Sequence, residues 1–125
     1  MKYLCLILAS FLPALTFAQE ITRITVVNQK TYNVVTTLFD AGALATFERH
    51  WNAKILSSLT PEPHWVYKID IETAHNSDRW LYDPRGWTKL RSNIETPLYT
   101  LPAPDKFNTI LGIGHAPEAK GLNRD

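Results

Sequence analysis

The stretch HWVYKIDIE, residues 64–72, decides the fold, because large apolar side chains recur in it at every second position. Trp65, Tyr67, Ile69 and Ile71 occupy one set of alternate positions, and mostly polar side chains occupy the other. Successive side chains of a strand point to opposite faces of its sheet. The stretch therefore predicts a strand with one apolar face, which a second layer of the fold must cover.

A hairpin is expected shortly after this strand. Residues 73–78 are polar and predict a loop, and residues 80–82 predict a short strand. The DPRG sequence at residues 83–86 is typical of a tight turn, with proline at the second position and glycine at the last. Residues 87–91 then return as the partner strand, and residues 98–101, bounded by two prolines, predict one more short strand.

Two strands are expected before the central one, at residues 21–27 and 31–36, because both segments are rich in β-branched side chains. Asn28, Gln29 and Lys30 can turn the chain between them, which predicts a second hairpin. Strands joined by short turns pair antiparallel, so we expect the whole sheet to be antiparallel.

The one long helix is expected between Asp40 and Ser57. Four large apolar residues fall three or four positions apart and so share one helix face: Leu44, Phe47, Trp51 and Ile55. Thr37 or Asp40 can accept hydrogen bonds at the start of this helix. The TPEP sequence at residues 60–63 must end it.

A second, short helix is expected from Pro104 to Leu111, with Gly112 at the position of a C-terminal cap. The elements then follow in the order ββ-α-βββ-α. This order predicts an α+β fold, with an antiparallel sheet of about four to five strands and the long amphipathic helix on one face. The opposite face should be half-polar and open, and we expect any binding function there.

Residues 1–18 have the pattern of a secretory signal peptide. Lys2 supplies a positive charge, an apolar run extends from Tyr3 to Phe11, and small residues occupy the cleavage positions. The run is shorter than the roughly 20 apolar residues that a membrane-spanning helix needs. We therefore expect cleavage after Ala18, no membrane span afterwards, and a periplasmic or secreted protein.

After cleavage, residues 19–115 would form a single small α+β domain and residues 116–125 a flexible tail. The one cysteine, Cys5, lies within the signal peptide, so packing rather than disulfide bonds must stabilise the domain. Acidic and basic residues balance once Lys2 is removed. A neutral domain of this kind argues against binding to nucleic acid or to an anionic membrane surface.

Two motifs in the C-terminal half resemble those of a group of small exported bacterial proteins. These are WLYD-x-x-G at residues 80–86, in the predicted hairpin, and FN-x-x-LGI at residues 107–113, in the predicted short helix. The members of this group are uncharacterised. The resemblance supports an envelope location and a single domain, and it implies no activity and no site residues.

The most suggestive polar cluster consists of Asp70 and Glu72 on the central strand, followed by His75 and Asp78 in the next loop. Residues two apart on a strand share a face, so both carboxylates should point the same way. Carboxylates with an imidazole can hold a divalent metal or act as an acid–base pair. The same composition is also ordinary for a solvated strand face that leads into a polar loop, so both interpretations stay open.

The aromatic residues around the DPRG turn are the other candidate site: Trp80, Tyr82 and Trp87, with Arg85 in the turn itself. Alternation places Trp80 and Tyr82 on one face of the sheet. Exposed aromatic side chains are good anchors for a protein or a sugar-like ligand. The alternative is that these rings belong to the core, and the need of a cysteine-free domain for large apolar side chains favours this alternative.

Sequence motifs that fix a catalytic chemistry are absent: there is no G-x-S-x-G, no H-E-x-x-H and no phosphate-binding glycine loop. We therefore expect a non-enzymatic exported protein without a cofactor. It would bind another protein of the cell envelope, as an inhibitor, an immunity-type protein or an accessory subunit. The alternatives are a small-ligand or divalent-metal-binding module that uses Asp70, Glu72, His75 and Asp78, and a small hydrolase that uses the same groups.

Overall fold

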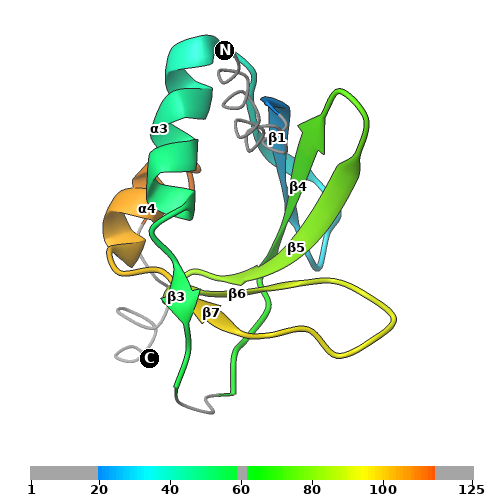
Figure 1. Cartoon of the computed structure of the whole chain (residues 1–125), viewed down its shortest axis with the longest axis vertical. Helices are drawn as coiled ribbons and strands as arrows, with labels where there is room; N and C mark the ends of the chain where they lie inside the picture. Colours follow the sequence, from blue (N-terminus) through cyan, green and yellow to red (C-terminus); the bar gives the residue numbers. More distant parts are fainter. Residues whose placement is uncertain (1–19, 59–61, 115–125) are drawn as a thin grey trace, which may run out of the picture.

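The computed structural model describes residues 20–58 and 62–114 as one antiparallel sheet with two helices packed on one of its faces (Figure 1). This confirms the predicted α+β class and the antiparallel sheet. The signal peptide predicted at residues 1–18 and the tail predicted at residues 116–125 lie outside the described residues.

The described chain contains seven strands and two helices. In chain order they are β1 (Ile21–Asn28), β2 (Val34–Leu38), α3 (Ala41–Trp51), β3 (Ile55–Leu56), β4 (Tyr67–Thr73), β5 (Ser77–Asp83), β6 (Trp87–Leu90), β7 (Tyr99–Thr100) and α4 (Pro104–Ile110). The strands lie side by side in the order β2-β1-β4-β5-β6-β7-β3, and every neighbouring pair is antiparallel. The short strands β7 and β3 therefore lie at one end of the sheet, and the two N-terminal strands β2 and β1 lie at the other.

The central strand β4 shows the predicted alternation, but it begins at Tyr67 rather than at His64. Ile69 and Ile71 are buried and face the helices, whereas Asp70, between them, lies on the opposite face. Val26 of β1 lies opposite Ile69 and extends the apolar face to the next strand. On the other side Trp80 of β5 lies opposite Ile69. The apolar side chains of three strands thus form one continuous surface for the helices to cover.

Aromatic rings connect the helix layer to the sheet. Phe47 of α3 lies 5.4 Å from Phe107 of α4, measured between ring centroids, and 5.5 Å from Trp51. Phe107 in turn makes an edge-to-face contact with Tyr82 of β5 at 5.5 Å. Phe47, Phe107 and Tyr82 are fully buried. Large rings at these distances supply the apolar area that a domain of this size needs for stability.

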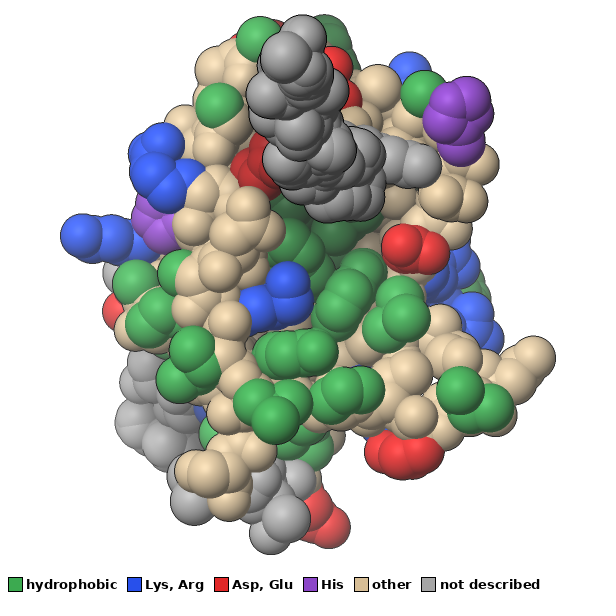
Figure 2. Space-filling model, in the orientation of Figure 1, with side chains coloured by type: hydrophobic (Ala, Val, Ile, Leu, Met, Phe, Trp, Pro, Cys, Tyr) green, Lys and Arg blue, Asp and Glu red, His purple; other side chains and the backbone are tan. Residues whose placement is uncertain are grey.

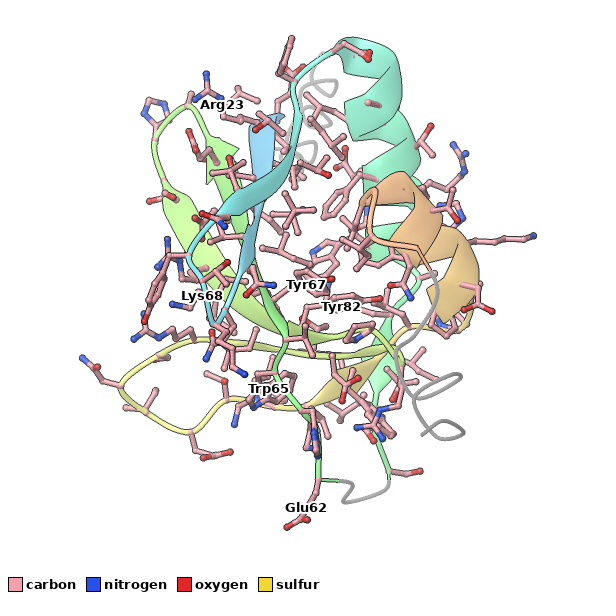
Figure 3. All side chains as sticks on the ribbon, turned by 180° about the vertical axis from the view of Figure 1, so that it is seen from behind. Arg23, Glu62, Trp65, Tyr67, Lys68 and Tyr82 are labelled. Atoms are coloured by element: carbon pink, nitrogen blue, oxygen red, sulfur yellow. The ribbon has the colours of Figure 1, made fainter. Side chains whose placement is uncertain are left out.

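A buried hydrogen-bonded chain secures α4. The hydroxyl of Tyr82 donates to Oδ1 of Asn108, and Nδ2 of Asn108 donates to the backbone carbonyl of Pro84 at 2.8 Å. Both side chains are fully buried, and burial raises the pKa of Tyr82 well above its usual value. Figure 3 shows Tyr82 pointing towards the helix side of the sheet, together with Tyr67. This chain of bonds satisfies polar groups that would otherwise be costly to bury.

The DPRG turn forms as predicted. The backbone N–H of Gly86 donates to the carbonyl of Asp83 at 2.8 Å, and Gly86 has a φ of 112°. A Cβ at this position would lie 3.2 Å from the carbonyl oxygen of Leu101 and from Cβ of Pro104. Glycine is therefore required both by the backbone conformation and by the close approach of the chain that leads into α4.

The strand count differs from the prediction. The sheet has seven strands among the described residues rather than four to five. β7 lies within residues 98–101, where a short strand is predicted, whereas β3 lies inside the segment predicted to be helical, and each is only two residues long. Strands of two residues have no period that a sequence pattern can show. β5 also begins at Ser77, so the loop predicted over residues 73–78 shrinks to a tight connection. The second strand, predicted at residues 31–36, lies instead at Val34–Leu38.

The long helix predicted from Asp40 to Ser57 is shorter, because α3 ends at Trp51. Asp40 caps its start as expected, with its carboxylate accepting from the N–H of Ala43 at 3.3 Å. Ile55, expected on the apolar helix face, is instead exposed and belongs to β3, where it lies opposite Thr100. Pairing with β7 outweighs the helical pattern here, since it completes the edge of the sheet.

Replacement of Phe47 by alanine should lower the free energy of unfolding by about 3–5 kcal/mol, because it removes a fully buried ring and leaves a cavity. Ile55→Ala is the matched control, since the sequence places both residues on one helix face but the structure exposes Ile55. We expect the control to lose less than about 1 kcal/mol. Urea denaturation followed by tryptophan fluorescence measures both, and equal losses would contradict the observed end of α3.

Tyr82→Phe should lower the free energy of unfolding by about 1–3 kcal/mol, because it leaves the buried Oδ1 of Asn108 without a donor. Tyr67→Phe is the control, since Tyr67 lies opposite Tyr82 on the same sheet face but is only half-buried. Its loss should be within about 0.5 kcal/mol. Thermal and urea unfolding of the two variants decide the matter, and a neutral Tyr82→Phe would show that the hydroxyl does not anchor α4.

Candidate functional site

Asp70 and Glu72, the two strand carboxylates predicted as metal ligands, lie on one strand as expected. Asp70, however, is already paired with Arg79. Asp70 and Glu72 both lie on the face of the sheet away from the helices. Asp70 accepts hydrogen bonds from Nε of Arg79 at 2.6 Å and from Nη2 at 2.8 Å. This bidentate pair raises the pKa of Arg79, chiefly through the hydrogen bond to Asp70, and occupies the carboxylate.

The remaining members of that polar cluster do not join Asp70 and Glu72. Asp78 lies opposite Ile71, which is buried beneath the helices, so Asp78 is on the other face of the sheet. His75 is exposed in the connection between β4 and β5. Within residues 20–58 and 62–114, no group of three or more His, Cys, Asp or Glu side chains is placed to hold a metal ion.

The aromatic residues of the hairpin are divided between the two faces of the sheet. Tyr82 is fully buried beneath α4 and therefore cannot serve as a surface anchor, which corrects its place in the predicted binding site. Trp87 lies on the opposite face, where the guanidinium of Arg85 stacks 5.0 Å from its ring. Trp80 alone remains on the helix side and partly exposed. Trp80, Arg85 and Trp87 do not form one surface.

Arg85 has a structural partner in Asp83. Nη2 of Arg85 lies 2.6 Å from Oδ2 of Asp83, and the backbone N–H of His64 donates to the same carboxylate at 2.7 Å. Burial alone would raise the pKa of Asp83, but the hydrogen bonds and the charge of Arg85 outweigh it and hold this pKa below its usual value. The ionised Asp83 thus ties the segment before β4 to the turn after β5.

The side chain of Lys54 lies among three aromatic rings on the helix side of the sheet. Its ammonium nitrogen is 4.2 Å from the ring centroid of Trp51, 5.2 Å from that of Trp80 and 5.5 Å from that of Tyr99. We call these four residues the aromatic box. The rings also contact one another: Trp51 and Trp80 meet edge to face at 4.9 Å, and Trp80 and Tyr99 are 6.2 Å apart.

Four different elements build the aromatic box. Trp51 is the last residue of α3, Trp80 belongs to β5, and Tyr99 belongs to β7. Lys54 lies in the turn between α3 and β3, where its N–H donates to the carbonyl of Trp51 at 3.2 Å. The early end of α3 therefore places Lys54 over the sheet rather than along a helix. These residues are far apart in the sequence, and only the folded chain brings them together.

The aromatic box opens onto a part of the sheet that the helices leave uncovered. Figure 2 shows hydrophobic side chains gathered on this face, over the region where Figure 1 places β3, β6 and β7. Leu56 of β3, whose side chain is on this face, is 64% exposed. Leu56 lies opposite Tyr99 and so extends the apolar surface to the edge of the sheet. Exposed aliphatic side chains beside half-buried aromatic rings are typical of an interaction surface.

Lys54 is a partly dehydrated cation. Burial lowers its pKa from the ordinary value of 10.5 to about 8, so the side chain is still mostly charged at neutral pH. The faces of the three rings attract the ammonium. The ion pairs of the described residues join Arg79 to Asp70, Arg85 to Asp83 and Lys89 to Glu95, and none includes Lys54. The box therefore holds a cation that a carboxylate would stabilise further.

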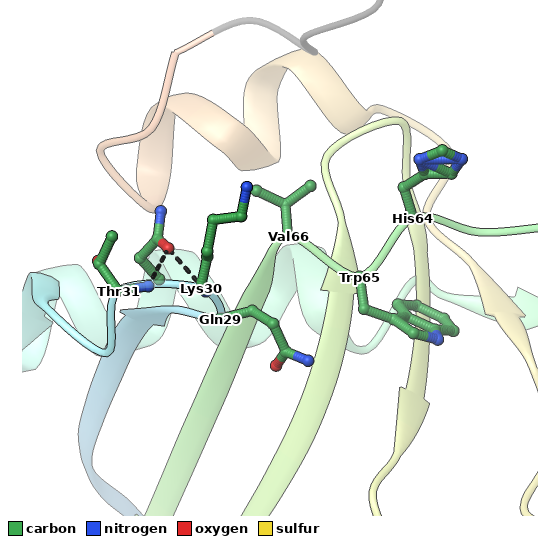
Figure 4. Close-up of a pocket in the computed structure, with 7 residues that line it drawn as sticks. Gln29, Lys30, Thr31, His64, Trp65 and Val66 are labelled. Atoms are coloured by element: carbon green, nitrogen blue, oxygen red, sulfur yellow. Dashed lines mark hydrogen bonds between the residues drawn. The ribbon is translucent and has the colours of Figure 1, made fainter.

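A hollow lies between the turn that joins β1 to β2 and the segment before β4 (Figure 4). It has a volume of about 500 Å³ and is lined by Asn28, Gln29, Lys30, Thr31, His64, Trp65 and Val66. Within the described residues, Oε1 of Gln29 is the one buried side-chain polar atom without a hydrogen-bond partner. This atom is enclosed by the protein, so a ligand in the hollow would reach it only if Gln29 turned. The aromatic box is for this reason the stronger candidate.

Reasoning from the sequence missed the aromatic box. It assigned Trp51 to the apolar face of a long helix, and it gave Lys54 and Tyr99 no role. The signal that could have indicated the site is a lysine three residues after a tryptophan, but such a pair is common on helices. The other two rings come from strands far along the chain, and their approach depends on the strand order.

Comparisons with protein-family models, with curated proteins and with solved structures find no match to this chain. In the part of the chain that the structure describes, no helix is both long and apolar enough to cross a membrane. The aromatic box itself contains an ammonium group and a phenol, but no carboxylate, imidazole, thiol or aliphatic hydroxyl. Its composition suits binding through aromatic surface and positive charge rather than proton transfer or nucleophilic attack.

The Lys54 side chain should lose its proton near pH 8, because its surroundings penalise the charged form. Unfolding restores the ordinary pKa of 10.5, so between about pH 8 and 10.5 the unfolded chain binds more protons at this residue. The contribution of Lys54 to stability should therefore rise with pH across that window. The Hε and Cε chemical shifts of ¹³C-labelled lysine measure the titration directly.

Lys54→Met is the control for this titration, since it keeps the length of the side chain and removes the charge. The unfolding free energy of the wild type should rise relative to that of Lys54→Met as the pH rises from about 8 to 10.5. A Lys54 titration midpoint at the ordinary value would show that the ammonium is fully hydrated and not enclosed by the rings.

Proposed function

We propose that this protein is a small, exported, non-enzymatic protein that binds another protein of the cell envelope through the aromatic box and the adjoining strand β3. The single observation that carries the proposal is the half-buried ammonium of Lys54, which lies among three rings and forms no ion pair in the described part of the chain. A cation in this position is less stable than a hydrated one until a partner supplies an anion.

The surroundings of Lys54 support a protein partner. Tryptophan and tyrosine dominate the energetic centres of protein interfaces, because each offers a large, rigid area with few rotatable bonds. Leu56, which lies opposite Tyr99, adds exposed aliphatic area directly beside the rings. Charged residues are scarce at the centre of such interfaces, and Lys54 is the one cation of the aromatic box.

The place of action follows from the pattern at residues 1–18 and from the resemblance to small exported bacterial proteins. Cleavage after Ala18 would release the domain into the periplasm or the medium. An inhibitor, an immunity-type protein or an accessory subunit needs a stable domain with one binding surface and no cofactor. A domain without cysteine, stabilised by aromatic packing, fits each of these roles.

A small-ligand or divalent-metal module is the weaker alternative. The bidentate pair between Asp70 and Arg79 would have to break before Asp70 could bind a metal ion. The hollow beside Gln29 has room for a small ligand, but its free acceptor is enclosed. A hydrolase built on Asp70, Glu72, His75 and Asp78 has the least support, because Asp78 is on the opposite face of the sheet.

Affinity capture from the envelope fraction of the host should recover one protein in near-equal amount with the tagged mature chain. Leu56→Gln should abolish the recovery, because it places a polar amide at the apolar edge of the aromatic box. Ile94→Gln is the matched control: Ile94 is 74% exposed but lies in the connection between β6 and β7. Mass spectrometry and densitometry of the eluates measure both variants.

Equal recovery with Leu56→Gln and the wild type would place the partner elsewhere on the surface and contradict this site. Recovery of the tagged protein alone, from cells in which the untagged protein is expressed and functional, would contradict a stable protein partner. Both variants change exposed side chains, so each should keep the unfolding midpoint of the wild type, which circular dichroism confirms before the capture.

A further inference from the structure

The proposed function leaves open what kind of group approaches Lys54, and the geometry of the ammonium narrows the choice. An ammonium has three N–H donors. The one hydrogen bond that Lys54 Nζ forms within the described residues is a 3.4 Å contact to the carbonyl of Trp51. The other directions face ring surfaces or the opening of the aromatic box. At least one donor is therefore free for an acceptor from outside.

A carboxylate is the acceptor that this environment favours. An attraction between opposite charges grows as water is excluded, and the three rings already exclude part of it. A carboxylate on the ammonium would form a charge-assisted hydrogen bond and would offset the dehydration that lowers the Lys54 pKa. A positively charged ligand would be repelled, because the aromatic box is already occupied by its own cation.

The sheet edge at β3 indicates how a partner could bind beside Lys54. β3 is the terminal strand in the order β2-β1-β4-β5-β6-β7-β3, so one side of its backbone has no neighbouring strand among the described residues. Ile55 and Leu56 pair with β7 on the other side. A strand edge of this kind can accept an extended segment of another protein, which then gains main-chain hydrogen bonds.

Lys54 and Leu56 have the spacing that an added strand would recognise. They are two residues apart and both lie towards the aromatic rings, since Leu56 is opposite Tyr99 and Lys54 stacks on it. Side chains directly opposite on paired strands have Cβ atoms about 4.5–5.5 Å apart. An added strand would thus place one side chain over Leu56 and, two residues away, another at Lys54.

We infer that the partner docks as an extended segment along β3, with a carboxylate side chain on Lys54 and an apolar side chain, two residues away, on Leu56. This inference rests on the proposed function and adds the chemistry of the partner to it. The recognised pattern is Asp or Glu, any residue, then an apolar residue, or the reverse order if the added strand runs the other way. The middle side chain would lie on the opposite face, beside the exposed Ile55.

Selection of displayed random nonapeptides on the folded mature protein tests this pattern without knowledge of the natural partner. We expect the enriched peptides to carry an acidic residue two positions from an aliphatic or aromatic one. For an enriched peptide, replacing the acid by its amide should weaken binding roughly tenfold or more, as expected for a partly dehydrated charge pair. Lys54→Met should weaken binding of the parent peptide to a similar degree and leave the amide peptide unaffected.

A charge exchange provides the sharpest control. Lys54→Glu should bind the parent peptide least and should regain affinity for a version with lysine in place of the acid. Amide chemical shifts of Ile55 and Leu56 should change on titration of the wild type, and those of Val34 and Val35, at the opposite edge of the sheet, should not. Enriched peptides without an acidic residue, no enrichment at all, or binding indifferent to Lys54→Met would each overturn the inference.

The outcomes separate this inference from the proposed function. Capture from the envelope could recover a partner that is lost with Leu56→Gln but kept with Lys54→Met. That result would support the binding function and would contradict the proposed contact between Lys54 and a carboxylate. If no partner is recovered but peptides of the expected pattern bind, the surface recognises such segments without forming a stable envelope complex. If the wild type captures no partner and binds no peptide, both the proposed function and this inference are contradicted.

Discussion

The contact between α4 and strand β5 is the constraint on which the rest of the structure depends. Asn108 accepts a hydrogen bond from the buried hydroxyl of Tyr82 and donates one to the carbonyl of Pro84, so its position on the sheet is set by directional bonds. Phe107, the preceding residue, then packs on Tyr82, Phe47 and Trp51. Apolar packing alone tolerates shifts between layers, whereas a fully satisfied buried polar chain permits one arrangement.

The position of α4 determines that of α3 and hence the candidate site. Trp51 stacks on Phe107 with one part of its surface and forms a wall of the aromatic box with another, so it belongs both to the core and to the site. The two helices cover the strands near β4, and the sheet continues beyond them to β7 and β3 (Figure 1). The mismatch between a wide sheet and a narrow helix layer leaves apolar area exposed around Lys54, which is the physical basis of the proposed binding surface.

Predictions from the sequence succeeded where a local pattern carries the information. The alternation in β4, the DPRG turn with a left-handed Gly86 and the cap at Asp40 all follow from the chemistry of neighbouring residues. The same reasoning failed at Ile55, whose helical spacing is correct but whose backbone pairs with β7. It also failed at Asp78, because the early start of β5 turns a predicted loop residue into a strand residue opposite Ile71. Of the aromatic box it identified Trp80 alone.

The sequence by itself determined the class of the fold and the apolar face of its longer strands, because side-chain period and turn chemistry act over a few residues. The tertiary structure alone decided the order of the strands, the end of α3 and the meeting of Lys54 with Trp51, Trp80 and Tyr99. These depend on contacts between residues up to about fifty positions apart, for which local propensity carries no signal. A strand of two residues, β3, exists only because β7 is there to pair with it.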